Sequence, residues 1–179
     1  MREEFFDLID DSTGQIIGRA SRKACHGNPA LIHRSVRVAV YHPSENAMLL
    51  QKRSSRKDLF PGLWDMAVGG HVDAGETPDR AAVREMEEEL GVPPGLTLKK
   101  TFQLKVRNAF ESENVQEYSV VCGGPFRIQR TELDDARFFT FEELRRMLSA
   151  SPEKFTPLLV RELRILLKQP EEARHAAGN

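Results

Sequence analysis

Residues 70–92 read GHVDAGETPDRAAVREMEEELGV, and this stretch carries the clearest local signals in the chain. The hydroxyl of Thr77 can cap a helix, and Pro78 suits the first helical position, where the backbone N–H has no helical partner. Gly91 can end the helix in the left-handed conformation, and the two prolines that follow prevent its continuation. The pattern therefore predicts a helix over residues 78–90.

Three acidic residues lie on one face of this predicted helix. Glu85, Glu88 and Glu89 occupy positions i, i+3 and i+4, so their carboxylates stand one turn apart. Like charges at this spacing repel each other, and a bound cation would offset the repulsion. Oxygen donors without clustered thiolates suit a hard ion, so the helix predicts a site for Mg²⁺, or for Mn²⁺ in its place. The alternative is an acidic face that is only solvated, and spacing alone does not decide between the two.

Outside this helix, the chain is a mixture of strand and helix patterns. Residues 4–9 and 15–20 flank a turn and predict a hairpin, while residues 22–34 have the pattern of an irregular loop. Further strands are expected at residues 36–42, 47–53, 64–72, 96–106, 115–123 and 136–141. Amphipathic helices are expected at residues 141–150 and 156–169. Because strands and helices do not alternate regularly, we expect an α/β fold with a mixed sheet packed between helices.

The composition fits one globular domain. Of the 179 residues, 40% are hydrophobic, and 26 Lys and Arg against 27 Asp and Glu leave a net charge of −1. A protein that coats nucleic acid or an anionic membrane usually has a basic excess, so neither a nucleic acid polymer nor a membrane is an expected partner. We expect a single domain over residues 1–170, in which residues 1–34 form an N-terminal hairpin and loop extension, and a flexible tail over residues 171–179.

The cysteines and the N-terminus bear on the compartment. Cys25 and Cys122 are not spaced as a metal-binding or redox pair, and the acidic N-terminus lacks the pattern of a signal peptide. We expect reduced thiols and, by default, a cytoplasmic location. The sequence does not fix the oligomeric state, and a homodimer is one option.

The stretch from Gly70 to Val92 resembles the Nudix box, G-x5-E-x7-R-E-U-x-E-E-x-G-U, where U is a bulky aliphatic residue. All nine defined places are filled, by Gly70, Glu76, Arg84, Glu85, Met86, Glu88, Glu89, Gly91 and Val92. A complete match of this length is highly specific. The resemblance implies a Nudix-type α/β/α sandwich, here with an N-terminal β-hairpin extension. It also implies a hydrolase that cleaves a diphosphate linkage in a nucleoside diphosphate derivative or a related organic pyrophosphate.

The resemblance also assigns roles within the box. The implied metal ligands are Glu85, Glu88, Glu89 and the backbone carbonyl near Gly70. Arg84 and Glu76 would brace the loop by pairing with neighbouring carboxylates or backbone, and Gly91 would end the helix. The three ligand glutamates and Arg84 are therefore the expected catalytic set, and the substrate would be a small diphosphate compound.

The flanking residues 51–73 resemble the Nudix subgroup that is similar to isopentenyl-diphosphate isomerase. In the isomerase, three histidines bind a metal; the matching residues here are His26, His33 and His71. A basic pair before a Pro-Gly step grips the diphosphate in the isomerase, and Arg53 and Lys57 match that pair. Each of these histidines could instead be a surface or hydrogen-bonded residue, and the basic loop could be only solvated.

The chain also departs from the isomerase. Gly69 stands where the isomerase has its catalytic cysteine, and the box here is complete whereas that of the isomerase is degenerate. The isomerase supplies two further glutamates from a later strand; Glu117 matches one, while the other falls on Val115. These differences favour a hydrolase over an isomerase, because function depends on the site and not on the fold. A non-catalytic nucleotide-binding module is the third reading, and a complete box disfavours it.

Glu117 has two readings of its own. It lies in an expected strand and could be an exposed strand residue. It could also be a fourth carboxylate that binds metal or activates water.

Overall fold

The computed structural model describes residues 3–57 and 59–170, so the tail expected at residues 171–179 lies outside the described residues. The helices are α1 (Arg22–Cys25), α2 (Pro78–Leu90), α3 (Phe141–Ala150) and α4 (Pro157–Leu166), with a 3₁₀ turn at Pro152–Lys154. The strands are β1 (Phe5–Ile9), β2 (Ile16–Ser21), β3 (Ile32–Tyr41), β4 (Ala47–Arg53), β5 (Trp64–Met66), β6 (Val68–His71), β7 (Lys99–Arg107), β8 (Ser112–Val121) and β9 (Leu133–Thr140). Over the same residues, no helix combines the length and the apolar character that crossing a bilayer requires.

The strands form two sheets. β1 and β2 make an antiparallel hairpin, as predicted from the turn between them. The larger sheet has the order β5-β4-β3-β8-β7, with β6 also paired to β3 and β9 to β4. Within it β3 and β8 run parallel, whereas the other pairs are antiparallel. The expectation of a mixed sheet is therefore confirmed.

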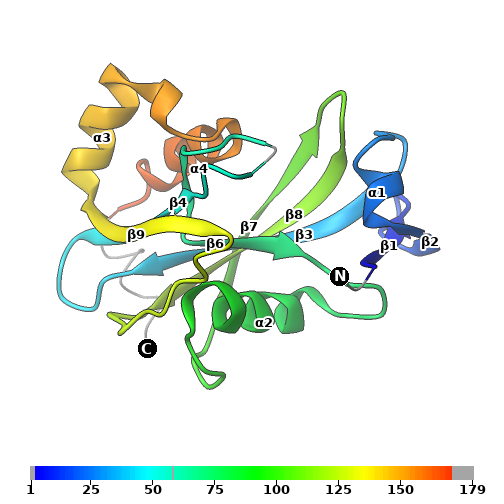
Figure 1. Ribbon diagram of the computed structural model, residues 1–179, viewed down its shortest axis with the longest axis horizontal. Coiled ribbons are helices and arrows are strands. Elements are labelled where there is room, and N and C mark those ends of the chain that lie inside the picture. Colours follow the sequence, from blue (N-terminus) through cyan, green and yellow to red (C-terminus); the bar gives the residue numbers. More distant parts are fainter. Residues whose placement is uncertain (1–2, 58, 171–179) are drawn as a thin grey trace.

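Helices cover both faces of this sheet. Figure 1 shows α2 on one face and α3 and α4 on the other, with the β1–β2 hairpin and α1 at one end of the sheet. Alternate residues of β3 enter the two cores, because successive strand side chains point to opposite faces. Val36 and Val38 pack with Met86 of α2, while Tyr41 packs with Leu163 of α4. The α/β/α sandwich with an N-terminal hairpin is thus observed.

The segment 22–34 differs from its prediction as an irregular loop. It begins with the short helix α1, because the Ser21 hydroxyl accepts a hydrogen bond from the backbone N–H of Ala24 at 3.3 Å. It ends inside β3, which starts at Ile32 because that part of the strand pairs with β8. This pairing connects residues about eighty positions apart, so no local pattern announces it. Its consequence is that His33 lies directly beside Glu113.

Strand β6 lies between β3 and α2 and carries the box residues Gly70 and His71. It pairs with β3, placing Gly70 beside Val36 and His71 beside Ser35. Helix α2 packs against it, with Ala82 and Met86 in the shared core. Gly69 and Gly70 of β6 therefore lie beside the acidic helix, and His71 contacts Phe6 of the N-terminal hairpin.

Candidate active site

Helix α2 begins and ends where the sequence predicts. The Thr77 hydroxyl accepts a hydrogen bond from the N–H of Arg80 at 3.4 Å, and Gly91 ends the helix in the left-handed region with φ of 65°. A buried stripe that includes Ala82 and Leu90 fixes the rotation of the helix against the sheet. Glu89 lies next to this stripe and is buried with it.

Two of the acidic side chains meet the glycine pair of β6. A Cβ atom on Gly70 would lie 2.1 Å from the carboxyl carbon of Glu85, so only glycine permits this approach. The N–H of Gly69 donates a hydrogen bond to Glu89 Oε2 at 3.2 Å. Burial raises the pKa of Glu89 to about 8, and the charge of Glu85 adds to the effect. Burial also raises the pKa of Glu85. We call Glu85, Glu88 and Glu89 together the carboxylate site.

Arg84 links the carboxylate site to the loop before the helix. Its guanidinium donates to Glu85 Oε1 at 2.7 Å and to Glu88 Oε2 at 3.3 Å. It also donates to Glu76 Oε2 at 2.9 Å and to the carbonyl of His71 at 2.9 Å. One guanidinium therefore holds the box loop against β6 and places a positive charge between two of the expected metal ligands.

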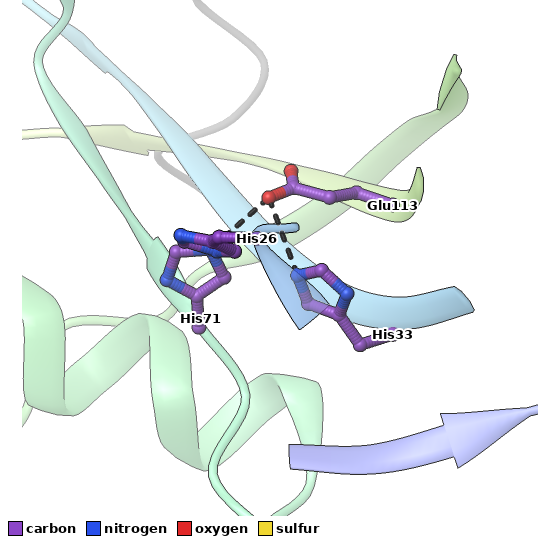
Figure 2. A group of neighbouring side chains, drawn as sticks. All are labelled: His26, His33, His71 and Glu113. Atoms are coloured by element: carbon purple, nitrogen blue, oxygen red, sulfur yellow. Dashed lines mark hydrogen bonds and ion pairs between the residues drawn. The ribbon is translucent and has the colours of Figure 1, made fainter. Parts of the chain in front are cut away.

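The tightest metal-capable set among the described residues lies at the histidines. The donor atoms of His26, His33, His71 and Glu113 all lie within 4.8 Å of one another. The side chains come from the residue after α1, from β3, from β6 and from β8, and Figure 2 shows them turned toward a common point. We call this set the histidine centre. Over residues 3–57 and 59–170, the glutamates of the carboxylate site do not form a set this tight.

The contacts within the histidine centre suit a transition-metal ion. The Nε2 atoms of His26 and His71 are 3.2 Å apart, and His71 Nε2 is 3.0 Å from Glu113 Oε1. His33 Nε2 is buried, makes no hydrogen bond within the described part of the chain, and lies 3.5 Å from the same Glu113 oxygen. Imidazole nitrogens with a carboxylate are the donor set of zinc, manganese or iron sites.

Neighbouring groups set the protonation state and the orientation of these donors. Burial lowers the pKa of His26 to about 4, and the charge of His71 adds to the effect, so His26 is the neutral imidazole that a metal requires. Ser35 Oγ donates to Glu113 Oε2 at 2.8 Å, which leaves Oε1 facing the histidines. Phe6 of the hairpin stacks on His71 with a centroid distance of 4.7 Å, so the N-terminal extension closes one side of the centre.

Glu117 is not a member of the histidine centre. It lies on β8 beside Arg37, and its buried Oε1 makes no hydrogen bond among the described residues. Burial raises the pKa of Glu117 well above its usual range, and the charge of Glu162 adds to the effect. Arg37 is itself buried and donates to both oxygens of Glu162 at 2.9 Å. The strand glutamate that joins the histidines is Glu113, which the sequence reading had not singled out.

The Arg37 side chain occupies the space next to Gly69, the position that matches the isomerase cysteine. A Cβ atom on Gly69 would lie 2.9 Å from Nη1 of Arg37, so a larger residue there would have to displace the guanidinium. The Arg37 guanidinium is held by Asp65 as well as by Glu162. Sequence alone offered one hint of this network. Glu162 interrupts an otherwise apolar helical stripe that includes Leu159 and Leu163.

The basic pair expected to bind phosphate has partners within the chain. Arg53 donates to the carbonyl of Leu59 at 3.1 and 3.0 Å and lies 3.3 Å from Asp65 Oδ2. Lys57 pairs with Glu132, and burial together with the charge of Arg53 lowers the pKa of Lys57. Arg53 ends β4, and Lys57 lies on the segment between β4 and β5.

Sequence comparisons agree with this fold. The NUDIX domain family model matches residues 31–159. The chain is 33% identical over 169 residues to Nudix hydrolase 3 of Arabidopsis thaliana, a match that spans 88% of this chain and 22% of that protein. It is 31% identical over 170 residues to the Nudix hydrolase YfcD of Escherichia coli, spanning 93% of this chain and 88% of that protein. It is also 29% identical to the isopentenyl-diphosphate Delta-isomerase of Nocardia farcinica, over 89% of this chain and 92% of the isomerase.

Solved structures show the same architecture. The chain matches DR0079 of Deinococcus radiodurans with a TM-score of 0.76 and 24% identity, over 90% of this chain and 98% of that one. It matches the NUDIX domain of Shewanella oneidensis NrtR, solved with ADP ribose, with a TM-score of 0.56 and 18% identity, over 83% and 94% of the two chains. The chain belongs to the NUDIX family, as a Nudix hydrolase with relatives among the isopentenyl-diphosphate isomerases.

Proposed function

We propose that this protein hydrolyses the diphosphate linkage of a nucleoside diphosphate derivative or a related organic pyrophosphate, and that it requires Mg²⁺ or Mn²⁺. The observation that carries the proposal is the placement of Glu85 and Glu89 against the backbone of Gly69 and Gly70. A buried carboxyl group (Glu89) and a partly buried one (Glu85), both with raised pKa values and held at one point of the backbone, are the environment that a divalent ion would stabilise.

The proposed ligands are Glu85, Glu88 and Glu89, with the carbonyl of Gly70 as a further donor. A bound Mg²⁺ would supply charge neutralisation of the phosphates and a more acidic attacking water. Arg84 already orients Glu85 and Glu88 through charge-assisted hydrogen bonds, so these two ligands are positioned before an ion binds. Glu76 would support the site indirectly by holding the box loop through Arg84, and Gly91 would do so by ending α2.

Glu117 is proposed as a fourth carboxylate, in the role of water activation. Its carboxyl group is buried, with one oxygen that makes no hydrogen bond to the described residues. A raised pKa is typical of a group that takes up a proton during a reaction. Arg53 and Lys57 are proposed to bind the substrate phosphates, because Arg53 ends β4 and Lys57 lies on the segment that leads from β4 into β5 and β6.

The histidine centre favours a second candidate function, an allylic diphosphate isomerase. Three histidines and Glu113 have the donor types of a borderline divalent ion, and the Nocardia farcinica isomerase is a relative over most of the chain. Against this function, Gly69 provides no thiol, and Arg37 fills the space next to it. We therefore propose the centre as a second metal site of a hydrolase.

A screen for phosphate release would test the proposed function. Suitable substrates are nucleotide sugars, dinucleoside polyphosphates, nucleoside di- and triphosphates and coenzyme A, each with and without Mg²⁺. Glu89→Gln is expected to lower kcat by about 10²–10⁴-fold on the substrate found. Glu87→Gln is the matched control, because Glu87 is exposed on the same helix.

Equal rates for the Glu89 and Glu87 variants would refute the metal role of the carboxylate site. Turnover of isopentenyl diphosphate to its isomer, with no phosphate release from any substrate, would establish the second candidate instead. A cytoplasmic location and a homodimer remain proposals, and sedimentation of the purified chain would decide the second.

A further inference from the structure

A cavity of about 780 Å³ lies at the C-terminal end of α2. One wall is the segment after α2, residues 91–96, and the other is the segment after β8, residues 122 and 124–127. Figure 1 shows this end of α2 turned away from the β1–β2 hairpin. We call this space the α2-end cavity. Its volume is typical of pockets that enclose a small organic molecule, and no side chain of the carboxylate site or the histidine centre lines it.

The walls of the α2-end cavity are held in place by hydrogen bonds to α2. The backbone N–H of Arg127 donates to the carbonyl of Leu90 at 2.7 Å, and that of Gln129 donates to the carbonyl of Glu89 at 3.0 Å. On the other wall, the N–H of Val92 donates to the carbonyl of Met86 at 3.3 Å. A ligand would therefore enter a space whose walls are already ordered, which lowers the entropic cost of binding.

The walls present flat, apolar surfaces. Apart from the glycines, Cys122 and Arg127, the lining consists of aliphatic and ring side chains: Val92, Pro93, Pro94, Leu96, Pro125 and Phe126. The Phe126 ring lies 6.0 Å from that of Phe138, so the core holds it in place. Leu96 is 39% exposed, although its side chain is large and apolar. Planar rings pack closely on surfaces of this kind, so the walls favour an aromatic body over a polar one.

Arg127 gives the cavity a positive charge. Its side chain is exposed and has no hydrogen-bond or ion-pair partner within residues 3–57 and 59–170. The lining residues include no Asp or Glu that could neutralise the guanidinium. A guanidinium beside apolar walls binds a carboxylate or a sulfonate through charge-assisted hydrogen bonds. The charge therefore selects an anion, and the walls select its apolar body.

We propose that the α2-end cavity binds a small organic anion with a planar aromatic body, and that Arg127 contacts the anionic group. This site is separate from the proposed hydrolytic chemistry, because its walls carry none of the proposed metal donors or phosphate-binding residues. The ligand would stabilise the folded chain, since it binds walls that exist only when the end of α2 is formed.

Protection of Cys122 from alkylation would locate a ligand in this cavity. Cys122 lines the cavity and is half-buried, whereas Cys25 is fully buried, so N-ethylmaleimide is expected to modify Cys122 first. The probe is anilinonaphthalene sulfonate, which joins aromatic rings to one anionic group. The rate is followed by mass spectrometry of the full chain in a chelator. It should fall about tenfold when the probe is present at about ten times its Kd.

Variants of Arg127 would test the charge. Arg127→Gln is expected to weaken binding of the probe by at least about tenfold, and Arg127→Lys should retain most of the affinity. Arg146→Gln is the matched control, because it removes the same charge from an exposed position on α3, on the other face of the sheet. Thermal unfolding would confirm that each variant folds, as expected for exposed side chains.

A neutral dye separates the two parts of the proposal. Phenylnaphthylamine has the rings of the probe without the sulfonate, so it should protect Cys122 less well and equally in the wild type and Arg127→Gln. Equal protection by both dyes in the wild type would overturn the role of the charge, and so would equal losses in Arg127→Gln and Arg146→Gln.

An alkylation rate that saturating probe leaves unchanged would overturn the site itself. Dye fluorescence that rises without protection of Cys122 would do the same, because the dye would then be bound elsewhere. No turnover is measured and the chelator removes divalent ions, so failure of the proposed hydrolysis would leave this inference standing, and the reverse also holds.

Discussion

The carboxylate site and the histidine centre meet at one short strand, yet they are built in opposite ways. From β6, Gly69 and Gly70 contact the acidic residues of α2, and His71 enters the histidine centre. The histidine centre has its donors gathered within 4.8 Å. In the carboxylate site, the Arg84 guanidinium lies between Glu85 and Glu88.

The difference follows from the charges of the donors. Imidazoles bind metals in their neutral form, and the lowered pKa of His26 limits charge repulsion where His26, His33 and His71 meet without a cation. Carboxylates repel, and burial of Glu85 and Glu89 adds a desolvation cost that raises their pKa values. We infer that folding alone assembles the histidine centre. In the carboxylate site Arg84 already holds Glu85 and Glu88, but the charge of the three carboxylates is balanced only when an ion binds.

Gly70→Ala should have the largest effect. Its Cβ atom would overlap the Glu85 carboxyl group, which must then leave β6. A displacement of this size in a catalytic group lowers kcat/KM by about 10²-fold or more. Gly18→Ala is the control, because the nearest atom to its added Cβ is 3.7 Å away. Wild-type kinetics in Gly70→Ala would show that Glu85 does not need this position.

Arg84→Met should have a smaller effect on the same side of the contrast. The substitution keeps much of the side-chain length and removes the hydrogen bonds to Glu76, Glu85 and Glu88. Groups that orient metal ligands typically contribute 10–100-fold, so we expect a loss of about that size in kcat/KM at saturating Mg²⁺. If the variant were as active as the wild type, the guanidinium would be a passive neighbour of the site.

The two sites should respond oppositely to pH when the chain is free of divalent ions. The folded-state pKa of Glu89 is raised from 4.5 to about 8, so the folded chain holds a proton that the unfolded chain has lost. This contribution stabilises the fold at low pH and disappears as the pH rises through about 8. The pKa of His26 is lowered from 6.5 to about 4, so its contribution is present above pH 6.5 and is lost as the pH falls toward 4.

Urea unfolding in the presence of a chelator would measure these slopes. Each group changes the free energy of unfolding by at most about 1.4 kcal/mol per pH unit. Between pH 4.5 and 6.5 the two contributions oppose each other. Glu89→Gln should therefore remove the decline between pH 6.5 and 8, and His26→Gln should reveal a decline between pH 4.5 and 6.5 that the wild type does not show. Slopes that both variants leave unchanged would mean that other groups govern the pH response.

Local signals in the sequence predicted the acidic helix and its limits. Thr77 and Gly91 fix its two ends through contacts within a few residues, so no distant information is needed. Gly69 and Gly70 form a glycine pair inside an expected strand, which is typical of a close backbone approach, and Gly70 does allow the close approach of Glu85. The mixed sheet also followed from strand patterns, although strand ends shifted by several residues where pairing extends them.

Local sequence signals could not predict Glu113, the fourth member of the histidine centre. Glu113 reaches His33 through the parallel pairing of β3 with β8, which no local pattern specifies. Glu117 stood out instead, because it matches one of the two strand glutamates of the isomerase. The buried pair of Arg37 and Glu162 was missed for a similar reason, since its members lie 125 residues apart.

Anomalous diffraction from crystals soaked in Mn²⁺ would test the central claim most directly. The account predicts an ion bound by Glu85 and Glu89 beside Gly70, in addition to any ion at the histidine centre, and its loss in crystals of Glu89→Gln. Manganese at the histidines alone, with Arg84 still paired to Glu85 and Glu88, would contradict the proposed role of the carboxylate site.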